Sequence, residues 1–127
     1  MDSNEIYLPS FRTVKSTKKY LKHLKKRAKG DICPLCRERK TIKKFKYWRI
    51  IENDFPYDKI AKIHQMIVPR RHISEDELNK KELDEFKKIK KKHIVKNYDY
   101  ISEGMAKSIP NHFHLHLIVL NSAKVIK

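Results

Sequence analysis

The chain has 127 residues, a hydrophobic content of 39% and a formal net charge of +16, from 31 Lys and Arg residues against 15 acidic ones. This length fits one domain with a modest core, and its two cysteines are too few for a disulfide scaffold. No segment approaches the roughly 18 consecutive apolar residues of a membrane helix, and the first residues lack the apolar core of a signal peptide. We therefore expect a cytoplasmic protein with no membrane partner.

The excess of positive charge favours polyanionic partners such as nucleic acid or nucleotides. A solvated, lysine-rich surface explains the same composition, because Lys far outnumbers Arg and Arg is the better phosphate ligand. The charge alone does not choose between these two interpretations.

The first predicted element is a basic, amphipathic helix over residues 11–29. Apolar residues recur there near helical spacing between lysines, and Gly30 is a typical helix stop. We assign residues 1–29 to a basic N-terminal helical extension. Such a helix commonly packs one face on its domain, and a nucleic-acid or membrane arm is the less common alternative.

Two strands are predicted next, over residues 43–51 and 60–68, with Pro69 ending the second and a turn over residues 53–58 between them. Alternation in the first strand would place Phe45, Tyr47 and Ile51 on one face and Trp48 and Ile50 on the other.

A helix is predicted to begin at Ser74, since Ser74 and Glu77 have the spacing of a capping box. Acidic residues fill its first turn and lysines its last turns, as the helix dipole favours. A third strand near residues 98–102 leads to a fourth at the C-terminal end. This order of elements predicts an α+β fold with an antiparallel sheet.

The fourth strand carries three histidines, His112, His114 and His116, alternating with apolar residues. Alternation predicts a strand over residues 112–120, and residues two apart on a strand point to the same face. The three rings would then form a row with neighbours about 6.6 Å apart. Such a row can be a set of hydrogen-bonded core histidines, a zinc site, or a nucleophilic site that acts on a phosphate ester.

Two further motifs connect this row to a known family. Residues 64–72 have the pattern H-x-x-φ-V-P-x-x-H, where φ is apolar, and residues 112–118 have the pattern H-φ-H-φ-H-φ-φ. Together with the Asn-x-Phe-Pro-Tyr loop at residues 53–57, they resemble the histidine triad (HIT) superfamily of nucleotide hydrolases and transferases. The resemblance covers roughly residues 33–120. It implies that residues 30–127 form a HIT-like catalytic domain, an antiparallel sheet with a long helix packed on it.

The resemblance also implies roles for the histidines. His114 would attack the α-phosphate of a nucleotide ester, anhydride or phosphoramidate and form a covalent nucleotidyl-histidine. His116 would contact phosphate oxygens or assist the leaving group, and His64 would be a further active-site histidine. The chemistry is sound for these residue types, since neutral imidazole is a competent nucleophile near pH 7.

The same resemblance suggests three nucleotide-binding residues. Asn53 occupies the position of a side chain that binds the ribose hydroxyls. Ser108 and Asn111 are both candidates for the donor to the phosphate, because the loop before the histidine row lacks the family's usual glycine–glutamine pair. The family also commonly forms homodimers.

The two cysteines form a C-x-x-C motif at Cys33 and Cys36. From the residues alone, this motif is a redox pair, half of a zinc site or two buried thiols. Zinc-bearing members of the superfamily combine such a motif with a histidine after the second strand and the first histidine of the row. The implied ligands of a structural zinc are therefore Cys33, Cys36, His72 and His112.

Three functions follow from these patterns. The first is a nucleotidyl hydrolase or transferase that uses His114. The second is a basic nucleic-acid-binding module, or an enzyme that removes adenylate from nucleic-acid ends with the same fold. The third is a zinc-dependent hydrolase whose metal is bound by the histidine row itself.

Overall fold

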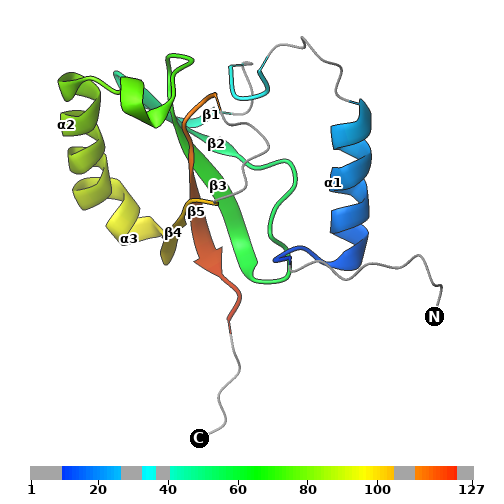
Figure 1. Cartoon of the computed structure of the whole chain (residues 1–127). Helices are drawn as coiled ribbons and strands as arrows, with labels where there is room; N and C mark the ends of the chain where they lie inside the picture. The colour runs from blue at the N-terminus through cyan, green and yellow to red at the C-terminus, as the bar shows by residue number, and fades with distance from the viewer. Residues whose placement is uncertain (1–9, 27–32, 37–40, 105–110, 123–127) are drawn as a thin grey trace, which may run out of the picture.

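The computed structural model describes residues 10–26, 33–36, 41–104 and 111–122 (Figure 1). Its five strands form one antiparallel sheet in the order β1-β2-β3-β5-β4. The strands are β1 (Thr41–Lys44), β2 (Trp48–Glu52), β3 (Ala61–Pro69), β4 (Tyr100–Ser102) and β5 (Leu115–Leu120). The helices are α1 (Val14–Lys26), α2 (Lys80–Ile89) and the short α3 (Val95–Asn97), with a 3-10 turn at Glu75–Glu77 and a π-helical turn at Lys90–Ile94. The expected α+β class, with a helix packed on an antiparallel sheet, is confirmed.

The sheet separates two apolar cores. α2 and α3 cover one face of the sheet, and α1 lies beyond the opposite face (Figure 1). The larger core, on the α2 face, contains Trp48, Ile50, Ile67, Ile89, Ile94, Phe113 and Leu117. The smaller core contains Leu35, Ile51, Met66 and Val68. Successive residues of a strand point to opposite faces, so Ile50 and Ile51, or Ile67 and Val68, belong to different cores.

The strand predicted over residues 43–51 is wrong in one respect: this segment is a hairpin. The backbone N–H of Phe45 donates to the carbonyl of Trp48 over 2.8 Å, which closes a turn between β1 and β2. Phe45 and Tyr47 therefore pack against the same core as Trp48, rather than on the opposite face. The alternation of lysines and aromatic residues continues through the turn, so the sequence pattern did not reveal it.

The helix predicted to begin at Ser74 begins later. Ser74 does hydrogen-bond to the Glu77 carboxylate through its N–H and its hydroxyl, both at 3.0 Å, but this box caps only the 3-10 turn. α2 has its own capping box, in which Asn79 and Glu82 bond to one another's backbone N–H groups. The sequence offers two capping boxes five residues apart, and the second one starts the long helix.

Glu82 also ties α2 to the sheet. Its side chain is only 1% exposed and accepts two hydrogen bonds from the Arg71 guanidinium, at 2.7 and 3.1 Å. Its backbone carbonyl accepts the indole N–H of buried Trp48 at 2.8 Å. These bonds fix α2 over the sheet, next to the end of β3. His72, the last residue of the H-x-x-φ-V-P-x-x-H motif, lies there.

Two further elements, β5 and α1, differ from expectation in their bounds. β5 begins at Leu115, so His112 and His114 precede the regular strand and only His116 lies within it. α1 spans Val14–Lys26, and the remainder of the predicted helix lies outside the described residues. In the part of the chain that the structure describes, no helix has the length and apolar character needed to span a bilayer.

Candidate metal centre and histidine site

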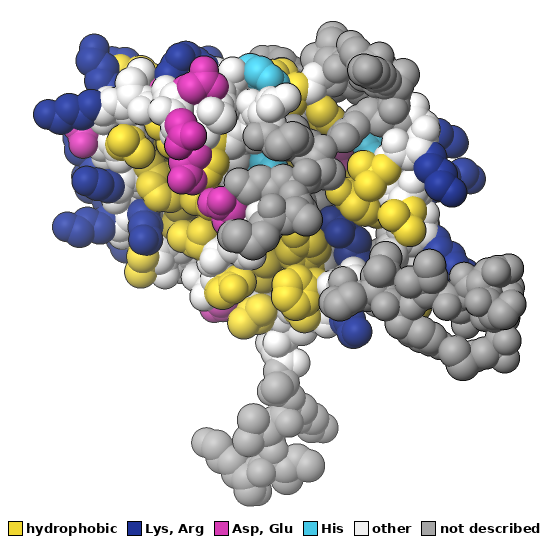
Figure 2. Space-filling view, viewed as in Figure 1, with side chains coloured by type: hydrophobic (Ala, Val, Ile, Leu, Met, Phe, Trp, Pro, Cys, Tyr) yellow, Lys and Arg dark blue, Asp and Glu magenta, His cyan; other side chains and the backbone are white. Residues whose placement is uncertain are grey.

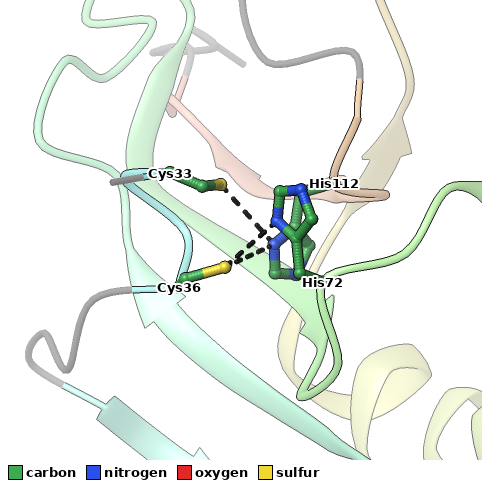
Figure 3. A group of neighbouring side chains, drawn as sticks. All are labelled: Cys33, Cys36, His72 and His112. Atoms are coloured by element: carbon green, nitrogen blue, oxygen red, sulfur yellow. Dashed lines mark hydrogen bonds between the residues drawn. The ribbon is translucent and has the colours of Figure 1, made fainter. Parts of the chain in front are cut away.

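Four side chains from three separate segments meet beside the smaller core. Cys33 and Cys36 come from the C-x-x-C turn, His72 follows β3, and His112 precedes β5 (Figure 3). One potential ligand atom from each lies within 4.8 Å of the others. The structure thus brings together all four residues that were expected at a metal site.

The spacing of these atoms fits tetrahedral coordination. The Nδ1 atom of His112 lies 3.6 Å from the Sγ of Cys33 and 3.4 Å from the Sγ of Cys36, and Cys36 Sγ lies 3.1 Å from Nδ1 of His72. A tetrahedral ion bound about 2.3 Å from sulfur and about 2.0 Å from nitrogen would hold S and N ligands about 3.5 Å apart. Four such ligands can close the coordination shell, which is typical of a structural site.

Neighbouring groups orient these ligands. The Nε2 atom of His112 lies 3.0 Å from the Pro69 carbonyl oxygen, which can only accept. His112 therefore carries its proton on Nε2 and directs the lone pair of Nδ1 toward the cysteines, as a metal ligand requires. The buried Arg49 guanidinium donates to the Leu35 carbonyl and fastens the C-x-x-C turn to β2. Burial, and then the neighbouring Cys33, raise the pKa of Cys36, so metal binding would release a proton.

The second cluster consists of the three histidines expected at a catalytic site. His64 on β3 is 3% exposed, and His114 and His116 are each 8% exposed. Met66 pairs with His116 and His64 with Ile118 across β3 and β5, so the register sets His64 and His116 side by side. The ring centroids of His114 and His116 lie 5.4 Å apart.

Hydrogen bonds define the tautomer of His114. Its Nδ1 atom lies 3.0 Å from the backbone carbonyl oxygen of His112. Because a carbonyl oxygen only accepts, Nδ1 carries the proton and the lone pair is on Nε2. The backbone carbonyl of His112 therefore fixes the ring of His114, while the His112 ring itself belongs to the candidate metal cluster.

A second chain of hydrogen bonds defines His64 and His116. The Tyr57 backbone N–H donates to Nδ1 of His64 at 2.9 Å, so the proton of neutral His64 is on Nε2. Nε2 of His64 lies 2.7 Å from Nδ1 of His116, so the His64 Nε2–H group donates and Nδ1 of His116 accepts. Neutral His116 is therefore protonated on Nε2, 3.5 Å from the Tyr57 hydroxyl.

Both of these histidines are neutral at pH 7. Burial lowers the pKa of His64 to about 3 and that of His116 to about 4. Protonation of a neighbouring histidine, and the positive charge of Arg12, act in the same direction. The cluster thus offers N–H donors and imidazole lone pairs, rather than fixed positive charges.

The expected nucleotide-binding residues have different surroundings. Asn53 lies beside the cluster, with Nδ2 3.3 Å from Nε2 of His64, and its Oδ1 accepts the Phe55 N–H at 2.7 Å. Asn111 is exposed and directly precedes His112. Ser108 lies outside the described residues.

Sequence reasoning missed two residues that the structure places beside this cluster. The ring of Tyr57 lies 4.3 Å from that of His64 and 5.2 Å from that of His116. Arg12 lies 4.8 Å from the Tyr57 ring. Tyr57 belongs to the Asn-x-Phe-Pro-Tyr loop and could have been found there, whereas no motif marks Arg12.

Comparison with models of protein families found no match, and no curated protein matches the sequence.

We predict that the Cys33–Cys36–His72–His112 cluster binds one transition-metal ion per chain. Cys36→Ser should lose that ion, because it removes a thiolate ligand, and its melting temperature should fall. Elemental analysis of purified protein measures the metal directly. His93→Ala, which changes a histidine outside both clusters, should retain one ion. Metal that survives Cys36→Ser and disappears with His114→Ala would place the ion in the histidine row instead.

We predict that the free energy of unfolding falls as the pH decreases from about 6.5 to 4.5. In this window histidines of the unfolded chain take up protons at an ordinary pKa of about 6.5, whereas His64 and His116 stay neutral in the folded chain. Asp58, Glu77 and Glu82, whose pKa values are lowered by hydrogen bonds, contribute mainly below this window.

Denaturant unfolding at several pH values measures how the free energy of unfolding changes with pH. This change should be smaller in His116→Asn than in the unsubstituted chain at equal metal content. A free energy of unfolding that stays constant, or rises, as the pH falls through this window would contradict the neutral state of the two histidines.

Proposed function

We propose that the chain is a nucleotidyl hydrolase or transferase of the histidine triad type, with His114 as the nucleophile. The observation that carries the proposal is the hydrogen bond from His114 Nδ1 to the His112 carbonyl, because it leaves the nucleophilic lone pair on Nε2. Neutral His116 supplies an N–H donor, and neutral His64 fixes the tautomer of His116. Asn53, Ser108 and Asn111 remain the proposed nucleotide-binding residues.

In the proposed reaction, Nε2 of His114 forms a bond to the α-phosphorus as the bond to the leaving group breaks. The leaving group takes the bonding pair, and the nucleotidyl group stays on His114. The positive charge that develops on the imidazole is stabilised by the His112 carbonyl through Nδ1–H. The Nε2–H group of His116 can donate to a phosphoryl oxygen. Water, or another acceptor, then displaces His114, the pair returns to Nε2, and the attacking group loses a proton.

We further propose that the metal ion is zinc and that it is structural. Two thiolates and two imidazoles are a ligand set that zinc favours, and four protein ligands leave no position for a reacting water. The ion would link the C-x-x-C turn to the segment after β3 that carries His72 and to the segment before β5 that carries His112.

We predict that His114→Ala loses at least about 1,000-fold in turnover of an adenosine phosphoramidate or dinucleoside polyphosphate, because the covalent route is removed. In the unsubstituted chain, mass spectrometry after a brief reaction with a slowly hydrolysed adenosine phosphoramidate should find one adenylyl group on His114. The His93→Ala control should react at an unchanged rate. Undiminished turnover by folded His114→Ala would refute His114 as the nucleophile.

A second candidate function is nucleic-acid binding through α1. The exposed side chains of this helix include Lys15, Lys18, Lys19, Lys22, Lys25 and Lys26. Lys and Arg side chains gather along both flanks of the molecule, over α2 and over α1 (Figure 2). A basic helix face of this kind can contact a phosphate backbone without reading its sequence.

We predict for this candidate that binding to single- or double-stranded oligonucleotides weakens steeply with salt, and that Lys18→Glu with Lys22→Glu weakens it roughly tenfold or more. The matched control is Lys87→Glu with Lys91→Glu, which changes the same charge beside α2. Fluorescence anisotropy measures both. Absence of binding, or an equal loss of oligonucleotide affinity in the two variants, would rule out α1 as a nucleic-acid contact.

A further inference from the structure

Arg12, just before α1, is held in a fixed orientation next to the histidine cluster. Its guanidinium carbon lies 4.1 Å from the ring centroid of Tyr20 and 4.8 Å from that of Tyr57. Its Nε–H donates to the backbone carbonyl of Phe55 at 2.9 Å. Two aromatic rings and one hydrogen bond thus define where the planar guanidinium lies.

The segment that carries Arg12 is attached to the loop between β2 and β3 by several contacts. Asp58 accepts hydrogen bonds from the Thr13 N–H at 2.8 Å, from the Thr13 hydroxyl at 3.0 Å, and from the Ser16 hydroxyl. The Lys59 N–H donates to the Phe11 carbonyl at 2.9 Å. The start of α1 and this loop therefore form one side of the histidine site.

Tyr57 connects Arg12 to the histidines. Its ring contacts those of His64 and His116, and its hydroxyl lies 3.5 Å from Nε2 of His116. The positive charge of Arg12 also contributes to the lowered pKa values of His64 and His116, so its field reaches both rings. Arg12 is thus a full positive charge beside a cluster of neutral histidines.

The donors of Arg12 suit a phosphate. A guanidinium has five N–H groups in one plane, and the Phe55 carbonyl uses the one on Nε. The neighbouring carboxylate of Asp58 is occupied by Thr13 and Ser16. The two terminal nitrogens can present parallel N–H groups to an anion, which is the geometry that arginine uses to bind phosphate.

The position of Arg12 indicates which phosphate it would bind. His116 is the shared neighbour of His114 and Tyr57, with ring centroids 5.4 and 5.2 Å away. In phosphoryl transfer the attacking atom and the leaving atom lie roughly in line through phosphorus. A substrate attacked by His114 can therefore extend its leaving group past His116, toward Tyr57 and Arg12.

We propose that Arg12 binds the phosphate of an anionic leaving group, so that the site acts on nucleotidyl anhydrides in preference to substrates that release an amine. The proposal rests on the nucleotidyl transfer proposed above. As the anhydride P–O bond breaks, the departing phosphate takes the bonding pair as an oxyanion, and Arg12 offsets that charge. A phosphoramidate releases an amine, which has no negative charge for Arg12 to bind.

The first test compares two substrates that share the same adenylyl group. Arg12→Gln should lower kcat/KM for diadenosine tetraphosphate by about 10- to 100-fold and that for an adenosine phosphoramidate by less than about twofold. Lys87→Gln, which removes an exposed charge from α2, should leave both values within about twofold. An equal loss on both substrates, or no loss on either, would overturn the proposal.

The second test needs no turnover, and so separates failure of this proposal from failure of the nucleotidyl mechanism. Inorganic pyrophosphate, a model of the anionic leaving group, is titrated into the isotopically labelled chain. The NMR signal of the Arg12 Nε–H group should shift in a saturable way, and calorimetry should show affinity reduced about tenfold or more in Arg12→Gln but not in Lys87→Gln. An Arg12 signal that does not move at saturating pyrophosphate would overturn the proposal, even if Arg12→Gln failed to fold.

Discussion

The arrangement of the site depends on the hydrogen bonds and ligand contacts of one residue, His112. Its Nε2–H donates to the carbonyl of Pro69 at the end of β3, and its Nδ1 faces the thiols of Cys33 and Cys36. Its backbone carbonyl accepts the Nδ1–H of His114. One buried residue thus links the C-x-x-C turn, the sheet and the proposed nucleophile. Because the His112 carbonyl orients the His114 ring, we expect a change at the candidate metal cluster to reach His114 through a single peptide unit.

The electrostatics of the site follow from the contrast between its interior and its surroundings. The chain carries a formal charge of +16, which attracts anions, yet His64 and His116 are buried and neutral at pH 7. Neutral imidazoles keep the lone pairs and N–H groups that proton transfer and phosphate binding require. In the proposed function, the fixed positive charge comes from Arg12 at the edge of the cluster, and the nucleotide supplies the negative charge that it complements.

Much of the fold and most of the candidate site could be predicted from the sequence. β3 and β5 form in the segments predicted as strands, and the four proposed metal ligands meet as the resemblance implied. The hairpin at residues 45–47 was missed because the alternation of side chains continues across its turn. The start of α2 was misplaced because Ser74 and Asn79 both begin capping boxes. Arg12 and Tyr57 meet only through packing between segments far apart in the sequence, which no local pattern records.

Determination of the His114 tautomer is the measurement that tests this account most directly. In the metal-loaded, isotopically labelled chain at pH 7, NMR spectra of the imidazole nitrogens should show His114 as the neutral Nδ1–H form, with the lone pair on Nε2. Removal of the metal should disturb the His114 signals more than those of His93, because His112 connects His114 to the cluster. A His114 ring that is protonated on Nε2, or that is unaffected by metal removal, would contradict the account.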